Sequence, residues 1–377
     1  MFSSFFMAGF ECSTQRRGDG VRLDLVRSTG HQGCVLEDYR ACARLGLTTV
    51  RDGLRWHLIE ERAGHFDWSS WEPMLEAAAE AGVEVIWDIC HYGYPDHLEL
   101  GSDGFAAAYA RFAAAAVRRH RAVTGRPALV CPINEISFFT WAVNTGYFSR
   151  LDHNEPGWLK RRLVTVALAG VAAMKDADPQ CRFFWAEPLI HIGARSSEPE
   201  DIARAESLRL GQFEACDMLL GLAAPELGGG SHAADCIGVN FYPDNQWVSG
   251  GSTIPMGHHD YRPLADMLLE AHERFGKPLF VAETGAERSA RPAWFHYVCS
   301  EVREAQRRGV PIEGICIYPV TSFPGWDDSR HAEVGLFSTP HSDGTRRIDE
   351  PLAAELKRQQ ALFASAGQAG VLRARSA

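Results

Sequence analysis

Short apolar runs alternate regularly with longer helix-like runs along almost the whole chain, and this pattern limits the possible folds. The short runs have the length of buried strands, and the longer runs repeat apolar residues with helical spacing. Strands that alternate with helices pair in parallel through right-handed crossovers. The eight expected strands are 6–12, 47–52, 83–89, 128–134, 181–187, 235–242, 278–283 and 313–319. The helical runs between them include 37–46, 71–82, 105–120, 160–177, 261–276 and 294–309.

Eight strand–helix units in 377 residues, without a linker rich in proline, glycine or serine, predict one (β/α)₈ barrel. A doubly wound open sheet is the competing α/β fold, and it normally carries a G-x-G-x-x-G turn after its first strand. The corresponding segment here, GFECSTQRRGDG, does not have that form. We therefore expect an α/β protein with a single (β/α)₈ (TIM) barrel domain over residues 1–366 and a flexible tail over residues 367–377.

Composition argues against several classes of partner. The formal net charge is −10, and no cluster of lysine and arginine supplies the basic patch that nucleic acid or an anionic membrane requires. No apolar stretch approaches the roughly 18 residues of a membrane span. The ten cysteines form no C-x-x-C pair, and several lie in apolar runs, which is typical of buried, reduced thiols. The first residues, MFSSFFMAGFECS, lack the basic region of a signal peptide. We expect a cytoplasmic protein that binds no nucleic acid and does not insert into a membrane, and its oligomeric state stays open.

Polar residues gather where the expected strands end. The carboxyl ends of all strands meet at one face of such a barrel, and that face carries the chemistry. The residues at or just beyond these ends are Arg51, Asp52, Asp88, His91, Asn134, Glu135, Glu187, Asn240, Tyr242, Glu283, Tyr318 and Trp326. Two well-placed glutamates on this face suit cleavage of a glycosidic bond, in which one carboxyl group protonates the leaving oxygen and a second supports the cationic ring.

Two other kinds of chemistry that occur in such barrels require residues that this chain does not place at its strand ends. Of the fifteen histidines only His91 lies near a strand end, so a histidine-based metal site has too few ligands, and we expect no metal and no other cofactor. A His258-His259-Asp260 cluster is interpreted as a solvated turn. Schiff-base chemistry needs a lysine inside the barrel. The four lysines, which lie before a strand, on helices or near the tail, are Lys160, Lys175, Lys277 and Lys357.

Five short motifs occur in the order of strands two to seven. They are VRDGLRW (50–56), ICHYGYP (89–95), the pair Asn134-Glu135, GVNFYP (238–243) and FVAETG (280–285). In this order they resemble the clan A glycoside hydrolases, most closely glycoside hydrolase family 1, the β-glucosidase-like enzymes. The resemblance implies that Glu135 is the acid/base and Glu283 the nucleophile.

The resemblance also implies roles in substrate binding. Together with a stacking platform expected at Trp326, the substrate-binding set is Arg51, His91, Asn134, Asn240, Tyr242 and Trp326. Asn245 and Trp247, in the loop after the sixth strand, are weaker candidates for aglycone contacts. The chain departs from the family at the first strand, where Gln15 matches the family's glutamine only loosely. It departs again at the eighth strand, where CIYPVTSFPGW replaces the tryptophan motif.

The resemblance implies a retaining β-glycosidase that hydrolyses a small soluble β-glycoside by double displacement through a glycosyl-enzyme intermediate. Retention requires the two carboxyl groups to lie about 5–5.5 Å apart. Two alternatives stay open: a transglycosidase that uses the same two glutamates, and a non-catalytic sugar-binding barrel. For Glu187 a salt bridge is expected, with an auxiliary acid as the minority interpretation, and the same question applies to Glu11.

Overall fold

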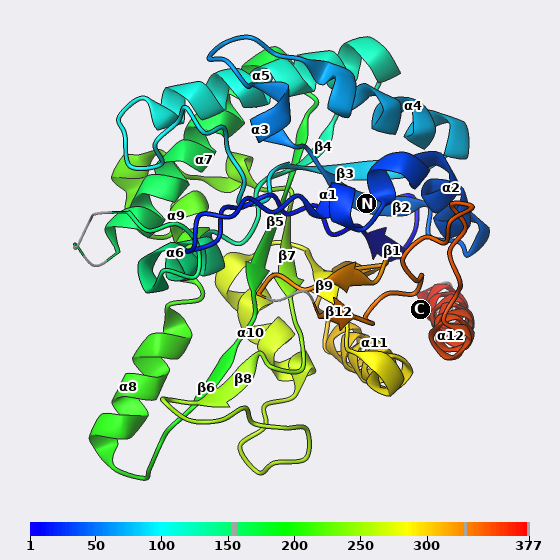
Figure 1. Ribbon diagram of the computed structural model, residues 1–377. Helices are drawn as coiled ribbons and strands as arrows, with labels where there is room; N and C mark the ends of the chain where they lie inside the picture. Colours follow the sequence, from blue (N-terminus) through cyan, green and yellow to red (C-terminus); the bar gives the residue numbers. More distant parts are fainter. Residues whose placement is uncertain (152–154, 156, 328–329, 375–377) are drawn as a thin grey trace.

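The computed structural model describes residues 1–151, 155, 157–327 and 330–374. Eight parallel strands close into a barrel in the order β1-β10-β9-β7-β5-β4-β3-β2 (Figure 1). Their bounds are β1 Phe6–Gly9, β2 Thr49–Gly53, β3 Glu84–Cys90, β4 Leu129–Ile133, β5 Arg182–Pro188, β7 Cys236–Asn240, β9 Leu279–Thr284 and β10 Ile312–Ile317. Each expected strand overlaps one of these, so the (β/α)₈ barrel is confirmed, with strand ends shifted by a few residues.

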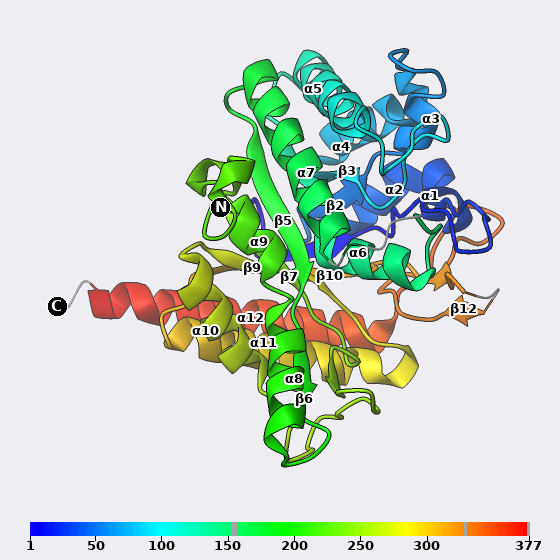
Figure 2. The same cartoon turned by 90° about the vertical axis from the view of Figure 1, so that its left-hand side faces the viewer.

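Six helices match the expected helical runs and surround the barrel (Figures 1 and 2). They are α2 His31–Arg44, α4 Glu72–Ala81, α5 Phe105–Thr124, α7 Trp158–Ala177, α10 Leu264–Phe275 and α11 Arg291–Arg307. Gly82, Gly125 and Gly276 end α4, α5 and α10 with φ of 68°, 69° and 60°. Glycine adopts this left-handed conformation at little steric cost, so each helix stops where the next strand must begin.

The other elements lie outside the expected strands and helices. They are the helices α1 Leu25–Ser28, α3 Trp56–Ile59, α6 Ile136–Thr145, α8 Pro199–Leu210, α9 Glu214–Leu219 and α12 Glu350–Ala374, and the 3₁₀ turns Trp68–Ser70, Pro225–Leu227, Ser231–Ala233 and Arg288–Ala290. Two small sheets pair β6 His191–Gly193 with β8 Gln246–Val248 and β11 Phe323–Pro324 with β12 His331–Ala332. In both ribbon views α8 and β6 project away from the barrel.

The segment predicted to be a flexible tail begins inside a helix. Residues 367–374 continue α12, and residues 375–377 lie outside the described residues. The boundary at residue 366 is therefore not a boundary of secondary structure, and the mobility of this end stays a prediction.

Apolar side chains form two layers, one on each face of the barrel wall, because successive side chains of a strand point to opposite faces. One layer fills the barrel interior with residues such as Ile86, Phe184 and Phe280. The other lies between the strands and the helices and includes Phe183 and Trp185. Among the described residues, no helix is long and apolar enough to span a membrane. All ten cysteines are free, as expected for reduced thiols.

Candidate active site

Arg51, on β2, is the centre of the polar cluster at the carboxyl ends of the strands. Its side chain is 1% exposed. Its Nε and Nη2 donate to the two carboxylate oxygens of Asp88 at 2.9 and 2.8 Å, and its Nη1 donates to Oε1 of Glu283 at 2.6 Å. Nη2 also donates to Oδ1 of Asn134 at 2.6 Å. One guanidinium therefore ties together the ends of β2, β3, β4 and β9.

Glu283, on β9, accepts a hydrogen bond at each carboxylate oxygen. Arg51 donates to Oε1, and the hydroxyl of Tyr242 donates to Oε2 at 2.9 Å. The glutamate is 5% exposed, so both bonds are shielded from water. Charge-assisted hydrogen bonds of this kind hold an ionised carboxylate in one orientation.

Asn134 links this group to the end of β3. Because its Oδ1 accepts from Arg51, its Nδ2 donates to Nε2 of His91 at 3.0 Å and to the hydroxyl of Tyr92 at 2.9 Å. Nδ1 of His91 lies 2.8 Å from Oδ2 of Asp88. His91 thus accepts at Nε2 and carries its proton on Nδ1, facing Asp88.

Tyr92 completes the connection between the two candidate catalytic glutamates. Its hydroxyl accepts from Asn134 and donates to Oε2 of Glu135. A continuous chain of hydrogen bonds therefore runs from Glu283 through Arg51, Asn134 and Tyr92 to Glu135. Tyr92 is not among the site residues predicted from the sequence, although it directly follows His91 in the third-strand motif.

The backbone at the acid/base position is strained. Glu135 has φ 45° and ψ 64°, and Tyr92 has φ 66°, both in the left-handed region that side chains other than glycine avoid. Such residues cost about 1–3 kcal/mol each, and they gather at functional sites. Glu135 is also the N-cap residue of α6, which begins at Ile136. The polar pair thus stands where β4 has ended and a helix starts.

Glu135 is electrostatically unlike Glu283. Burial, together with the negative charge of Glu283, raises the pKa of Glu135 to about 8. It therefore keeps its proton at neutral pH, while Glu283 faces a guanidinium. Pairs of carboxyl groups set apart in this way supply an acid and a nucleophile that flank a scissile glycosidic bond.

The amides of Asn240 and Gln15 have free hydrogen-bonding capacity. Asn240 is fully buried at the end of β7, in register with Glu283, and Gln15 is 1% exposed. None of their four amide atoms makes a hydrogen bond of standard geometry among the described residues, although the amide of Asn240 lies close enough to Glu135 to lower its pKa. Buried polar groups are almost always paired, so these amides point to a polar ligand or to water.

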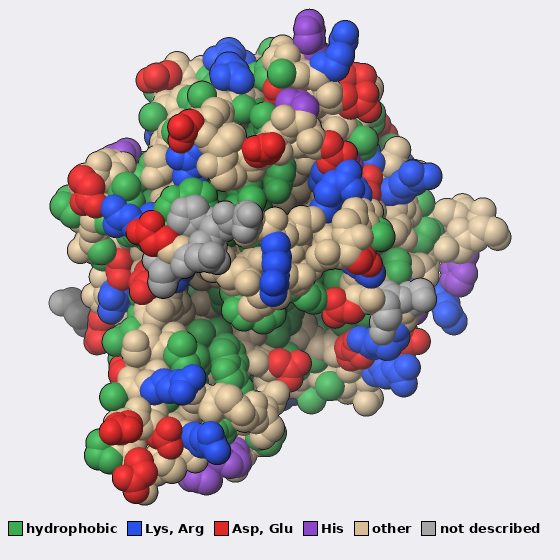
Figure 3. Space-filling view, turned by 60° about the vertical axis from the view of Figure 1, so that its left-hand side comes forward, with side chains coloured by type: hydrophobic (Ala, Val, Ile, Leu, Met, Phe, Trp, Pro, Cys, Tyr) green, Lys and Arg blue, Asp and Glu red, His purple; other side chains and the backbone are tan. Residues whose placement is uncertain are grey.

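Trp326 packs on the acid/base side of the site. Its ring lies edge-on to Tyr92 with centroids 5.9 Å apart, and 6.1 Å from both Phe138 and Phe148. Figure 3 shows hydrophobic side chains gathered around a hollow in one face, with acidic and basic side chains intermixed around it. The aromatic group of Phe138 and Phe148 was not expected from the sequence, because its members meet only in the fold.

The weaker loop candidates are less directly placed. The side-chain amide of Asn245 donates to the backbone carbonyls of Leu189 and Asn240 at 2.9 and 3.0 Å, so it holds the loop in place. Trp247 lies in β8, which pairs with β6 in the small sheet away from the barrel wall. Their aglycone contacts stay a prediction.

Two further carboxyl groups are buried near the site. Glu11 is 4% exposed and accepts from the backbone amide of Ser13 at 3.1 Å, and burial raises its pKa. Glu187 is also 4% exposed, and burial raises its pKa to about 7. No cation lies within ion-pair distance of Glu187 among the described residues, so the expected salt bridge is wrong; its partner is the backbone amide of Ser137.

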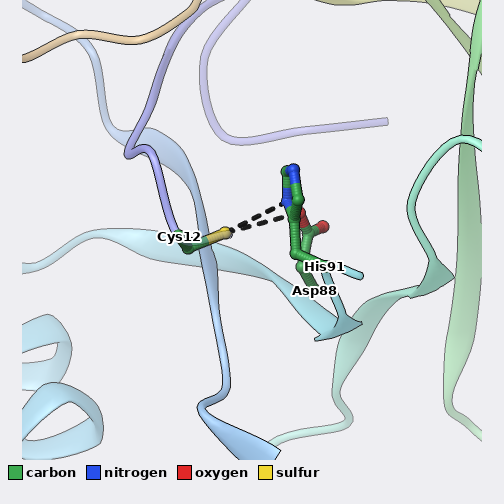
Figure 4. A group of neighbouring side chains, drawn as sticks. All are labelled: Cys12, Asp88 and His91. Atoms are coloured by element: carbon green, nitrogen blue, oxygen red, sulfur yellow. Dashed lines mark hydrogen bonds and ion pairs between the residues drawn. The ribbon is translucent and has the colours of Figure 1, made fainter. Parts of the chain in front are cut away.

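Cys12, Asp88 and His91 place their ligand atoms within 4.8 Å of one another, which invites comparison with a metal site (Figure 4). Both oxygens of Asp88 are engaged by Arg51, whose charge would oppose a cation. Burial, with the charge of Asp88, raises the pKa of Cys12 well above its usual range, so the sulfur stays a thiol. These residues fit a hydrogen-bonded network better than a metal centre. The exposed group His258, His259 and Asp260 lies away from the barrel strands.

No protein-family model matches the chain, and no curated protein matches it. Solved structures do. A family 1 β-glucosidase from Thermotoga maritima superposes with a TM-score of 0.70 at 13% identity, covering 88% of this chain and 87% of that one. The AHE enzyme from Alicyclobacillus herbarius gives 0.76 at 16% identity over 96% and 100% of the two chains, and the β-glycosidase BGL167 gives 0.70 at 19% over 89% and 87%.

These matches define the class of barrel. The closed parallel barrel of this chain is that of the β-glycosidases, and more particularly it has the fold of the family 1 β-glucosidases. The resemblance seen in the five sequence motifs is thereby confirmed for the fold.

Proposed function

We propose that the protein is a retaining β-glycosidase that hydrolyses a small β-glycoside, with Glu283 as nucleophile and Glu135 as acid/base. The observation that carries the proposal is the opposite setting of these two glutamates. Glu283 is held by Arg51 and Tyr242, whereas the pKa of Glu135 is raised to about 8. The fold shared with the β-glucosidases supports the same assignment.

In the first step a carboxylate oxygen of Glu283 forms a bond to the anomeric carbon as the glycosidic bond breaks, and Glu135 gives its proton to the leaving oxygen. The esterified Glu283 carries no charge, so one cause of the raised pKa of Glu135 disappears. Glu135 then removes a proton from water, which attacks the anomeric carbon and releases Glu283. Two displacements retain the configuration, and the separation of about 5–5.5 Å that this requires stays a prediction.

The sugar would bind through groups with spare hydrogen-bonding capacity. Asn240 and Gln15 offer unpaired amides, and Trp326 offers an aromatic surface next to Tyr92. His91 and Asn134 bond to each other, so a sugar hydroxyl would contact them by replacing that bond. Arg51 and Tyr242 act on the nucleophile rather than on the sugar.

Release of nitrophenol from a panel of aryl β-glycosides tests the proposal. We expect turnover of at least one glycoside by the wild type and its near loss in Glu283→Gln. Glu273→Gln is the matched control, because Glu273 is exposed on α10, and it should match the wild type. Turnover unaffected by Glu283→Gln would contradict the assignment, as would silence of the wild type across the panel. Analysis of products with an added sugar acceptor separates hydrolysis from transglycosylation.

The compartment follows from the cysteines in the same proposal. All ten are free and nine of them are buried. Thiols in this state suit a reducing compartment, so we propose a cytoplasmic enzyme that acts on a small-molecule glycoside.

A further inference from the structure

The residue at the N-cap position of α6 does not cap the helix with its own side chain. The first amides of a helix have no partner within the helix, and the side chain of the N-cap residue usually accepts one of them. The N-cap residue here is Glu135, whose side chain makes no such bond. Its Oε2 accepts from Tyr92 instead. The helix that carries the acid/base therefore needs its cap from elsewhere.

Glu187, at the end of the neighbouring strand β5, supplies that cap. Its Oε2 accepts from the backbone amide of Ser137, the second residue of α6, at 3.1 Å. The carbonyl of Ala186 accepts from the backbone amide of Glu135 at 2.8 Å. Two consecutive residues of β5 thus hold both ends of the strained turn from Glu135 to Ser137.

The direction of Glu187 separates it from the substrate side of the barrel. Side chains alternate along a strand, and Phe184 and Ala186 belong to the barrel interior. Glu187 lies on the same face of β5 as Phe183 and Trp185, which face the helices. Its contact with α6 agrees with that placement, which suits a supporting role better than a direct contact with substrate.

The burial of Glu187 in this position is energetically unfavourable. It is 4% exposed, has no cation within ion-pair distance among the described residues, and leaves Oε1 without a hydrogen-bond partner. Burying such a group costs free energy that an apolar residue would not cost. Its negative charge, when present, is among the causes that raise the pKa of Glu135.

We propose that Glu187 is a positioning residue for the acid/base: it caps α6 in place of Glu135, and so leaves the carboxyl group of Glu135 free for the substrate. The inference rests on the proposed function for the role of Glu135 but not for the cap itself. Glutamine at position 187 keeps an oxygen that accepts from Ser137, whereas alanine removes it. The two substitutions therefore separate the hydrogen bond from the charge.

The first test uses leaving groups of different quality on the same sugar. The dinitrophenolate group of an aryl glycoside leaves without needing a proton, whereas the alcohol of an alkyl glycoside must be protonated as it leaves. We expect Glu187→Ala to lower kcat/KM for the alkyl glycoside by about 10²-fold, within the range of general acid catalysis, and to change it little for the dinitrophenyl glycoside. Glu187→Gln should recover most of the loss. Equal losses on both substrates in Glu187→Ala would overturn the proposal.

Asp349→Ala is the matched control for loss of a helix cap. Oδ1 of Asp349 accepts from the backbone amide of Leu352 at 3.0 Å at the start of α12, and its Oδ2 pairs with Arg291 at 2.7 Å. This variant should lose stability without any dependence on the leaving group. A leaving-group effect of similar size in Asp349→Ala would mean that general destabilisation, and not capping of α6, explains the result.

The second test needs no activity. Amide hydrogen exchange over the peptide that contains Ser137 should be faster in Glu187→Ala than in the wild type and unchanged in Glu187→Gln. Carbon-13 NMR titration of Glu135 in Glu187→Gln should give a pKa below about 8, because a neighbouring negative charge is gone. Unchanged exchange in Glu187→Ala would overturn the cap. If the wild type cleaves no glycoside, the proposed function fails, and the exchange measurement still decides whether Glu187 caps α6.

Discussion

The two candidate glutamates, at the ends of β9 and β4, have opposite surroundings. Around Glu283 the charges are paired: its two oxygens accept from Arg51 and Tyr242, and Asp88 holds the same guanidinium. Around Glu135, whose backbone is strained, two carboxyl groups, its own and that of Glu187, are buried with no cation within ion-pair distance among the described residues. We call these the nucleophile half and the acid half of the site.

The difference shows how one residue type performs two tasks. Opposite charge and hydrogen bonds favour the ionised carboxylate, and burial beside a like charge favours the protonated acid. In the nucleophile half both carboxylate oxygens of Glu283 accept hydrogen bonds, which hold the side chain in one arrangement. In the acid half, the protonation of Glu135 depends on whether Glu283 carries a charge.

Removing one carboxyl group from each half should give unequal losses. Glu283→Gln should lower kcat/KM by about 10⁴-fold or more for every glycoside, because no other residue replaces the nucleophile. Glu135→Gln should lower it by about 10²–10⁴-fold for alkyl glycosides but far less for a dinitrophenyl glycoside, which needs no proton. Steady-state kinetics on both substrates checks this. Identical losses in the two variants would remove the distinction between the halves.

Arg51→Met should destabilise the nucleophile half and the fold. It leaves Asp88 and Glu283 buried without their cation, which typically costs about 3–5 kcal/mol. Urea denaturation measures the change. Arg161→Met is the control, because the exposed Arg161–Glu226 pair should contribute at most about 1 kcal/mol. Equal destabilisation in the two variants would show that the buried ion pairs of Arg51 contribute no more to stability than an exposed pair.

The outer face of β2 adds a pH-dependent anchor. Nδ1 and Nε2 of buried His31 lie 2.7 and 2.8 Å from Asp38 and Asp52. Burial lowers the pKa of His31, but the two aspartates outweigh it and raise the value to about 9, from 6.5 in the unfolded chain. Its contribution is therefore complete below pH 6.5 and is lost as pH rises through about 9. That contribution is about 3 kcal/mol.

Urea denaturation at pH 6 and at pH 9.5 checks the His31 contribution, with His31→Asn as comparison. The variant should show a smaller difference between the two pH values than the wild type. Burial lowers the pKa values of His57 and His120 to about 4, so their contributions change only as pH falls below 6.5. At pH 6 they lower the stability of the wild type and of His31→Asn alike, so their effect cancels in the comparison. A difference between the two pH values that is as large in His31→Asn as in the wild type would contradict the assignment.

The smallest effect is a shift in the pH profile of the acid half. Because Glu135 must carry a proton, kcat/KM should fall as pH rises through about 8. The hydrogen bond from Tyr92 lowers the pKa of Glu135, so Tyr92→Phe should move this limb to higher pH, by roughly 0.5–1 unit. Tyr297→Phe, on α11 and outside the site, should leave the limb in place. A shift to lower pH in Tyr92→Phe would contradict the network.

Much of the fold was predictable from the sequence because its signals are local. Apolar runs of strand length and helical periodicity need no knowledge of distant residues, and they located all eight strands and six of the helices. The strand-end residues followed from the barrel, since all carboxyl ends meet at one face. Arg51 and Glu283 are 232 residues apart in sequence, yet the barrel brings their side chains into a hydrogen bond.

The barrel and the set of polar residues at its mouth could therefore be predicted from the sequence. How those residues are paired depends on the three-dimensional arrangement of the strands. The left-handed backbone of Glu135, its bond to Tyr92 and the cap from Glu187 depend on the relative positions of β3, β4 and β5. The salt bridge expected for Glu187 was wrong for the same reason. Whether a buried carboxyl group meets a cation or a helix amide is set by which elements pack beside it, and no local pattern in the chain records that.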